Sequence, residues 1–378
     1  MPKLDIALTP DEVDTYLASE RTVRLATTGD GAADAVIVDG VAHLEATDGE
    51  PDAVLTADPE TWRRIAADLR GGMDAFNRGR LSVRNNLHVG VGFLAATSGA
   101  TTPERLEFKR AAGLSYLQAG VGEPVVMLHG LGATKVSLLP TVAALMPRFH
   151  AIALDLPGAG DSDKPVGAPY DARYFAESVI KFLDALKIDR AHVVGNSLGG
   201  RVALELGLRY PDRVRRLALL APSLAWRRDR PWAPLLRIVP PELGLLQLAP
   251  LPVVEGVVRR LIPGAQGGWA AAGVDEFLRV YLTPRGRAAF YAAARQIYLE
   301  EPEGDDGFWT RLKTLRPEAL FVWGRKDQIV PLTFARHVSE AVPRAQHVEL
   351  DCGHVPQLER PRETHAAVLQ FLAGGRRP

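Results

Sequence analysis

The stretch Val-Gly-Asn-Ser-Leu-Gly-Gly at residues 194–200 decides the fold that the rest of the chain is expected to adopt. An apolar run at residues 191–194 leads into it, and a helix-favouring run at residues 202–206 follows at once. A sharp turn from strand to helix would expose the hydroxyl of Ser197 above the sheet edge, and crowding at such a turn explains why Gly195 and Gly199 lack side chains. The helix N-terminus below the turn directs backbone N–H groups toward any negative charge that develops there. The pattern therefore predicts a nucleophilic serine.

The sequence from residue 105 onward alternates between short apolar runs and helix-like segments, which predicts a mostly parallel sheet covered by helices on both faces. The apolar runs do not alternate with polar residues, as is typical of strands buried on both faces. They lie at residues 125–128, 151–154, 217–220 and 319–323. Residues 224–316 interrupt the alternation with a Pro- and Leu-rich segment and helical pieces. We expect this segment to form a helical lid over Ser197.

A carboxylate and a histidine follow two later strands of the predicted sheet. Asp327 comes just after the strand at residues 319–323, and His354 comes just after the strand at residues 347–350. The ends of parallel strands share one edge of the sheet, so we expect both side chains to meet Ser197. A serine hydroxyl needs a base to take its proton, and the base needs an acid that holds its tautomer. The sequence therefore predicts a catalytic triad of Ser197, Asp327 and His354.

Two backbone N–H groups are candidates for stabilising the oxyanion that forms when the serine attacks. The N–H of Leu198 follows the nucleophile directly. The N–H of Leu131 lies in the loop after residues 125–128, where Gly130 allows the backbone to turn. One such donor contributes about 3–4 kcal/mol in the transition state. We predict an oxyanion hole formed by Leu131 and Leu198.

These motifs together resemble those of the α/β-hydrolase family, across about residues 105–374. The matching motifs are His-Gly-Leu-Gly at 129–132, Asp-Leu-Pro-Gly-x-Gly-x-Ser at 155–162, Gly-Asn-Ser-Leu-Gly-Gly at 195–200, Gly-Arg-x-Asp at 324–327 and Gly-His at 353–354. The resemblance implies an α/β fold with an eight-stranded sheet and a cofactor-free mechanism through an acyl-serine. Serine at position 197 argues against the epoxide-hydrolase and haloalkane-dehalogenase branches, which have aspartate there.

The substrate is less well defined than the nucleophile. The leading hypothesis is hydrolysis of a carboxylic ester with an apolar or lipid-like acyl group, as in carboxylesterases and lipases, with Trp226, Trp232 and Trp269 as candidate substrate contacts. Further candidate pocket aromatics in residues 224–316 are Phe290, Tyr291, Phe308 and Trp309. The alternative is a carbon–carbon bond hydrolase of the meta-cleavage type, which also carries Gly-Asn-Ser-x-Gly-Gly. Acyl transfer to an acceptor other than water and a lipid carrier with a secondary hydrolase activity remain further hypotheses.

Residues 1–94 are predicted to form a separate, small α+β unit, and the small polar residues at 95–104 a linker to the hydrolase unit at 105–378. Thr9 and Asp58 each precede a proline and begin predicted helices, and Gly71-Gly72 is expected to end the second. The unit resembles the sterol-carrier-protein-2 (SCP2) lipid-binding fold at residues 53–62 and at Met-Asp-Ala-Phe-x-x-Gly-Arg-Leu-x-Val, residues 73–83. This resemblance implies an apolar tunnel for lipid, and docking is the alternative role.

The composition limits the other classes of function. Basic and acidic residues balance at 45 each, so no net charge favours binding to nucleic acid. No apolar run approaches the ~20 residues of a membrane span, although transient membrane contact stays open. The single cysteine, Cys352, and the absence of an export signal favour the cytoplasm. Neither a nucleotide nor a metal motif is present, so we expect no cofactor. The oligomeric state cannot be inferred.

Overall fold

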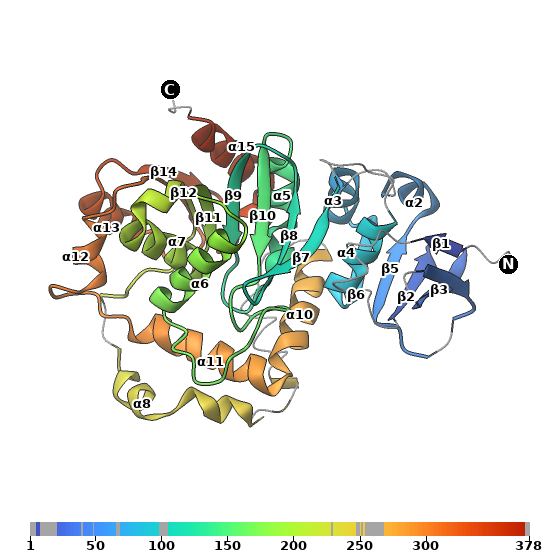
Figure 1. Ribbon diagram of the computed structural model, residues 1–378, viewed down its shortest axis with the longest axis horizontal. Coiled ribbons are helices and arrows are strands. Elements are labelled where there is room, and N and C mark those ends of the chain that lie inside the picture. The colour runs from blue at the N-terminus through green and yellow to red at the C-terminus, as the bar shows by residue number, and fades with distance from the viewer. Residues whose placement is uncertain are drawn as a thin grey trace.

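Two β-sheets lie side by side in the computed structural model of the chain (Figure 1). The structure describes residues 5–7, 21–38, 41–47, 49–65, 69–97, 105–227, 230–246, 250, 252–253 and 268–374. The smaller sheet is formed by the N-terminal residues and the larger one by the remainder of the chain. We refer to them as the N-terminal unit and, after the resemblance found in the sequence, the hydrolase unit.

The larger sheet has eight strands in the order β14-β13-β12-β11-β9-β10-β8-β7. All neighbours from β10 to β14 pair in parallel, and β8 pairs antiparallel with both β10 and β7. The prediction of an eight-stranded, mostly parallel sheet is confirmed. The strands are β7 (Glu107–Ala111), β8 (Leu114–Ala119), β9 (Glu123–Leu128), β10 (Phe149–Leu154), β11 (Ala191–Asn196), β12 (Val214–Leu220), β13 (Glu318–Gly324) and β14 (Gln346–Leu350).

Helices cover both faces of this sheet because successive side chains of each strand point to opposite faces. Val125 and Met127 of β9 belong to a core with α5 (Leu139–Leu145) and α15 (Pro361–Leu372), whereas Val126 and Leu128 belong to a core with α6 (Ala172–Ala185) and α7 (Leu198–Arg209). The remaining helices outside the insertion described next are η1 (Lys135–Leu138), η2 (Pro211–Arg213), α13 (Phe334–Ala341) and α14 (Pro356–Glu359).

The segment between β12 and β13 is helical in its described parts, as the sequence predicts. It contains α8 (Ala233–Ile238), η3 (Pro241–Leu245), α10 (Gly268–Tyr281), α11 (Pro284–Leu299) and α12 (Phe308–Leu312). In Figure 1, α8 and α11 lie at the lower side of the hydrolase unit. Residues 228–229, 247–249, 251 and 254–267 of this insertion lie outside the described residues. Its role as a lid stays a prediction.

The N-terminal unit has a six-stranded sheet in the order β1-β4-β3-β2-β5-β6, in which only β2 and β5 pair in parallel. Its strands are β1 (Asp5–Ala7), β2 (Arg21–Thr27), β3 (Gly31–Val38), β4 (Val41–Glu45), β5 (Ala53–Ala57) and β6 (Leu81–Asn85), and its helices are α2 (Pro59–Ile65), α3 (Leu69–Asn77) and α4 (Leu87–Ala96). The helix expected to begin after Thr9 lies outside the described residues.

Two local expectations in this unit differ from the structure. Gly71 and Gly72 do not end a helix, because α3 runs through both of them. Burial of Ala75 and Phe76 at 3% and 2% exposure outweighs the ~1 kcal/mol that each glycine costs a helix. The second difference concerns the predicted linker: α4 continues to Ala96, so the first two residues of that segment are helical.

The two units share one hydrophobic core. This core includes Val23 and Leu55 of the small sheet, Phe93 of α4, and Leu139 and Val142 of α5. Residues of α3 lie against α5, and residues of α10 lie against β6. The N-terminal unit is therefore packed directly against the hydrolase unit. None of the helices in the described parts of the chain is both long and apolar enough to cross a membrane.

Candidate active site

Ser197 sits at the turn between β11 and α7 with φ 51° and ψ −115°, a backbone conformation that a side-chain-bearing residue adopts only under local constraint. The flanking glycines make this turn possible. A Cβ on Gly195 would lie 2.3 Å from the carbonyl oxygen of Gly199, and a Cβ on Gly199 would lie 2.2 Å from that of Leu128. The backbone N–H of Ser197 donates to the carbonyl of Leu220 at 3.1 Å. The turn is fixed from both sides.

The structure brings Ser197, His354 and Asp327 together. Nε2 of His354 lies 2.9 Å from Oγ of Ser197, and Nδ1 lies 2.8 Å from Oδ2 of Asp327. The Asp327 side chain is completely buried, and its Oδ1 accepts hydrogen bonds from the N–H groups of Ile329 and Val330 at 2.8 and 2.9 Å. Both carboxylate oxygens therefore have donors, which fixes the plane of the acid. The imidazole can take the serine proton on Nε2 while Nδ1–H donates to Asp327.

Glu359 of α14 holds the loop that carries His354, a role that the sequence analysis did not identify. Its Oε2 accepts from the N–H of Gly353 at 2.7 Å, and its Oε1 accepts from the N–H of Val355 at 3.0 Å. One carboxylate thus binds the backbone on both sides of the catalytic histidine. The only hint of this role in the sequence is that an acidic residue follows His354 at a distance of five positions.

His129 anchors the loop that carries the second predicted oxyanion donor. Its Nε2 accepts from the N–H of Leu156 at 3.0 Å, so Nδ1 carries the proton and donates to the carbonyl of Gly130 at 2.8 Å. Burial lowers the pKa of His129, which keeps the ring neutral. A Cβ added to Gly130 would lie 3.3 Å from Cβ of Ser197, so this loop runs directly beside the nucleophile.

A cavity lies beside the serine, between the loops 129–133 and 156–159 and the helices α10 and α11. Both predicted oxyanion residues, Leu131 and Leu198, line it. The aromatic side chains in its wall include Phe175 of α6 and three side chains of α10 and α11. These three, Phe277, Tyr281 and Phe290, are neighbours at ring distances of 5.1 to 5.8 Å. Its described lining includes no carboxylate, Lys or Arg side chain. The cavity is suited to an apolar group attached to the reacting carbonyl.

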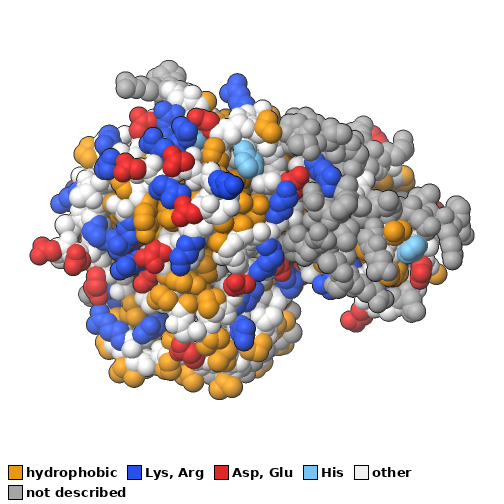
Figure 2. All heavy atoms as spheres, in the orientation of Figure 1, with side chains coloured by type: hydrophobic (Ala, Val, Ile, Leu, Met, Phe, Trp, Pro, Cys, Tyr) orange, Lys and Arg blue, Asp and Glu red, His pale blue; other side chains and the backbone are white. Residues whose placement is uncertain are grey.

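Two of the three tryptophans predicted as substrate contacts lie outside the lining of this cavity. Trp226 and Trp232 are not among the residues that line this cavity, and Trp232 is 64% exposed. The side chain of Trp269 lies outside the described residues. Figure 2 shows hydrophobic side chains along the lower edge of the hydrolase unit, where α8 lies. The exposed apolar residues of that segment are Trp232, Leu235, Ile238, Leu243 and Leu246. Substrate contact by the tryptophans stays a prediction.

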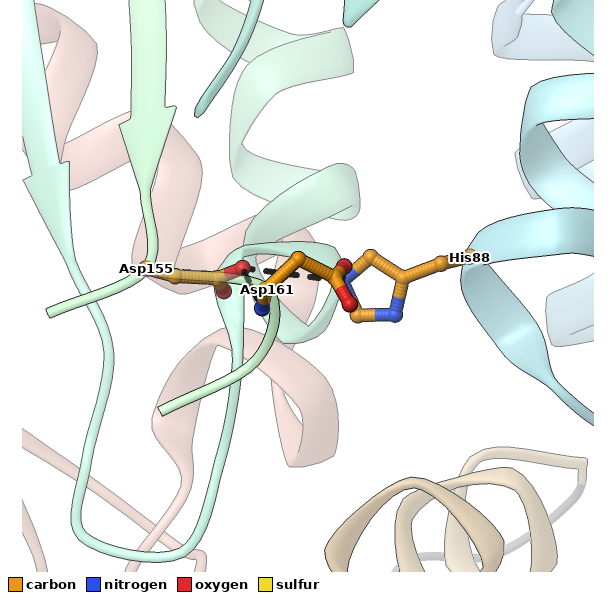
Figure 3. A group of neighbouring side chains, drawn as sticks. All are labelled: His88, Asp155 and Asp161. Atoms are coloured by element: carbon orange, nitrogen blue, oxygen red, sulfur yellow. Dashed lines mark hydrogen bonds and ion pairs between the residues drawn. The ribbon is translucent and has the colours of Figure 1, made fainter. Parts of the chain in front are cut away.

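A buried charged cluster lies behind the loop 156–159. Among the described residues, His88, Asp155 and Asp161 are the one group whose ligand atoms lie close enough, within 4.8 Å, to hold a metal ion (Figure 3). However, Nζ of Lys135 lies 2.6 Å from Oδ2 of Asp155 and 3.5 Å from Oδ2 of Asp161. The lysine already supplies a cation to these carboxylates, so the cluster is a salt-bridge network.

The sheet order, the serine turn and the histidine and acid at the same sheet edge define an α/β-hydrolase. The family model of the alpha/beta hydrolase fold matches residues 123–361, which is more than half of the chain. The chain therefore belongs to this family. It is similar to a 2-hydroxymuconate semialdehyde hydrolase from Pseudomonas sp. (strain CF600), at 30% identity over 68% of this chain and 88% of the relative.

Two further similar proteins are also named as hydrolases of this kind. A 2-hydroxy-6-oxo-6-phenylhexa-2,4-dienoate hydrolase from Burkholderia cepacia is 32% identical over 68% of this chain and 90% of the relative. The solved structure of a meta-cleavage product hydrolase from Pseudomonas fluorescens IP01 aligns with a TM-score of 0.54 and 26% identity, covering 71% of this chain and 97% of that chain. The family match at residues 123–361 does not include the N-terminal unit.

Proposed function

We propose that the chain is a serine hydrolase that cleaves the carbon–carbon bond of a vinylogous 1,5-diketone, leaving an apolar acyl group on Ser197. The observation that carries this proposal is the Ser197–His354–Asp327 hydrogen-bonded chain beside an apolar cavity. The identity of the bond is supported by the named substrates of the relatives, which favour the carbon–carbon alternative over the ester hypothesis.

The residues divide the reaction into two halves. Oγ of Ser197 attacks the ketone carbonyl while Nε2 of His354 takes the hydroxyl proton, and Asp327 stabilises the imidazolium that forms. The N–H groups of Leu131 and Leu198 receive the negative charge on the carbonyl oxygen. The carbon–carbon bond then breaks, the leaving carbon departs as a delocalised enolate, and His354 returns the proton. Water, deprotonated by His354, releases the acid from Ser197.

The apolar cavity restricts the acyl half of the substrate. Because the cavity contains both proposed oxyanion residues, the group attached to the reacting carbonyl would lie against Phe277, Tyr281 and Phe290. A phenyl or alkyl ketone fits this lining, whereas a carboxylate at that end would be buried without a cation. We therefore propose an aryl or alkyl ketone at the acyl end.

Ester hydrolysis is the second candidate. The dienoate substrates named for the relatives carry a carboxylate, yet no charged side chain occurs in the described cavity lining. An ester with an apolar acyl group would occupy the same cavity and form the same acyl-serine. The two candidates differ only in the group that leaves.

Parallel assays separate the candidates. The purified chain is given an aryl vinylogous 1,5-diketone and, in separate reactions, p-nitrophenyl esters of increasing chain length. Turnover of the diketone with kcat/KM well above that of every ester is the expected result. Turnover of the esters alone would contradict carbon–carbon cleavage. Ser197→Ala should abolish both activities and labelling by a fluorophosphonate probe, and labelling that survives would refute Ser197 as the nucleophile.

For the N-terminal unit we propose docking onto the hydrolase unit as its main role, with lipid binding of the SCP2 type as the alternative. The buried state of α4 between the two units supports docking, since Leu87, Val89 and Phe93 are 4% exposed or less. Binding of a fluorescent fatty acid to the full chain, unaffected by covalent blockage of Ser197, would instead favour a lipid site in this unit.

A further inference from the structure

His88 of the N-terminal unit is buried among charged groups of the hydrolase unit. It is the second residue of α4, whose N-terminus is capped by the Asn86 side chain. Its side chain is 1% exposed, with Nδ1 3.0 Å from Oε1 of Glu276 and Nε2 3.6 and 3.9 Å from Oδ2 of Asp161 and Asp155. Figure 3 shows its imidazole ring reaching from α4 toward the two aspartates. Burying an ionisable ring here is favourable only with such partners.

Asp155, one of the partners of His88, supports the loop at residues 129–133 that carries the proposed oxyanion donor Leu131. Asp155 accepts from both the backbone N–H and Nζ of Lys135, at 2.7 and 2.6 Å, and from the N–H of Asp161 at 3.0 Å. The next residue, Leu156, donates its N–H to His129, the residue that precedes Gly130 and Leu131. Displacement of Asp155 would therefore displace the N–H of Leu131 through two hydrogen bonds.

Another partner of His88, Glu276, lies on α10, the opposite wall of the cavity. Arg279 bonds to Glu276 at 2.8 Å and to Oδ1 of Asp161 at 3.0 Å, and its Nη2 lies 3.2 Å from Nδ1 of His88. Phe277, one residue from Glu276, lines the cavity. His88 thus contacts residues that hold the oxyanion loop on one side of the cavity and residues of α10 on the other side.

The charged groups of this cluster shift one another's pKa. Burial raises the pKa of the Asp161 carboxyl, but the charges of His88, Lys135 and Arg279 outweigh burial and hold that pKa well below its usual value. Removing the His88 ring from such a cluster leaves the buried carboxylates with one partner fewer, which forces them to move or to take up water. The loop and α10 are the elements free to respond.

We infer that His88 is a positioning residue for the hydrolytic reaction: through Asp155, Asp161 and Glu276 it fixes the spacing between the oxyanion loop and the α10 wall. The N-terminal unit is then part of the support of the active site. This inference rests on the proposed function of Ser197 and the oxyanion loop, but it does not depend on which bond is cleaved.

The test compares His88→Ala with Arg84→Ala. Arg84 bridges the same two units through an ion pair with Asp275 at 2.7 Å, but its side chain is 48% exposed and it does not touch the cluster. The readouts are kcat, KM, the rate constant of fluorophosphonate labelling, and Tm. Loss of an oxyanion donor costs about 10²–10³ in kcat. For a displaced donor we expect His88→Ala to lower kcat and the labelling rate at least tenfold with little change in KM, and Arg84→Ala to change kcat less than twofold.

Imidazole rescue distinguishes positioning from general destabilisation. Added imidazole should restore fluorophosphonate labelling of His88→Ala, because imidazole can fill the site that the side chain leaves empty. Labelling of Arg84→Ala should not change when imidazole is added. The signal of Ser197→Ala is subtracted as the background. If His88→Ala does not melt cooperatively, the same measurements are made on His88→Gln, and the same at least tenfold loss of kcat is expected. A folded His88 variant with kcat within twofold of Arg84→Ala would overturn the inference, as would a loss of labelling that imidazole fails to restore. Absence of labelling in the wild type would instead refute the proposed function.

Discussion

Glu359→Gln should slow catalysis without removing any group that touches the substrate. The carboxylate accepts two backbone N–H groups, from Gly353 at 2.7 Å and Val355 at 3.0 Å, on either side of His354. A glutamine keeps one acceptor oxygen and turns an N–H₂ group toward the other backbone N–H. One of the two hydrogen bonds is then lost, and His354 becomes free to shift away from Ser197.

The magnitude follows from the number of bonds lost. A hydrogen bond to a charged group contributes about 1.5–3 kcal/mol, and the partly buried position of Glu359 favours the lower end. Because about 1.4 kcal/mol corresponds to a factor of ten in rate, losing one bond should lower kcat about tenfold. Glu359→Ala loses both bonds and should lower kcat about a hundredfold. In both variants KM should stay near the wild-type value.

The assay is steady-state kinetics on the best substrate of the wild type, with Tm measured on the same preparations. Asp351→Asn is the matched control, since Asp351 lies on the same loop but is exposed and pairs with Lys326 at 2.9 Å. It should leave kcat unchanged. A folded Glu359→Ala with kcat within twofold of the control, or an effect confined to KM, would refute the view that Glu359 positions His354.

Three further predictions concern the triad, the cavity and stability. Asp327→Asn should lower kcat about 10⁴-fold by releasing the tautomer of His354, measured by single-turnover kinetics, and a loss below tenfold would contradict the assigned role. Phe277→Ala should raise kcat/KM for bulky relative to small acyl groups about tenfold, and an unchanged ratio would place the acyl group elsewhere. Burial raises the pKa of Glu205, but Arg201, Arg311 and Arg209 together outweigh burial and lower the pKa to about 2. The folded pKa lies below that of the unfolded chain, so the stabilisation is complete above pH about 4.5 and is lost as pH falls toward 2. Glu205→Gln should therefore lower Tm at pH 7 by leaving Arg201 without one of its partners, and its difference from wild type should shrink between pH 4.5 and 2 in thermal melts.

The hydrolase unit could be predicted in outline because its strands are buried on both faces. Runs such as residues 125–128 have no polar alternation, and the residues that follow each run lie at the same sheet edge. The prediction that Ser197, Asp327 and His354 meet used only this rule and the chain order. The eight-stranded sheet was implied by the family resemblance and is confirmed by the structure.

The cavity wall could not be predicted in the same way. The aromatic side chains that line the cavity include Phe175, Phe277, Tyr281 and Phe290, and of these only Phe290 was among the predicted pocket aromatics. Which side of a helix faces a cavity depends on how that helix packs, and α10 and α11 are placed by contacts with segments far away in the sequence. Amphipathic spacing fixes the apolar face of a helix but not the element that the face covers.

The N-terminal unit shows the same limit more sharply. His88 is the one ionisable residue in the apolar run of α4, and this oddity was visible in the sequence. Its partners Asp155, Asp161 and Glu276 lie 67 to 188 residues further along the chain, and no local pattern links them to it. The core that the two units share likewise cannot be read from local patterns, because its residues come from distant parts of the chain.

The sequence by itself determined the α/β-hydrolase sheet, the turn at Ser197 and the identity of the base and acid, because each depends on short-range patterns at the ends of buried strands. Only the tertiary structure decided the shape and polarity of the cavity, the anchoring of His354 by Glu359, and the burial of His88 in a charged cluster of the other unit. These features depend on contacts between residues distant in the chain, where packing and charge pairing act on positions that local propensity leaves undetermined.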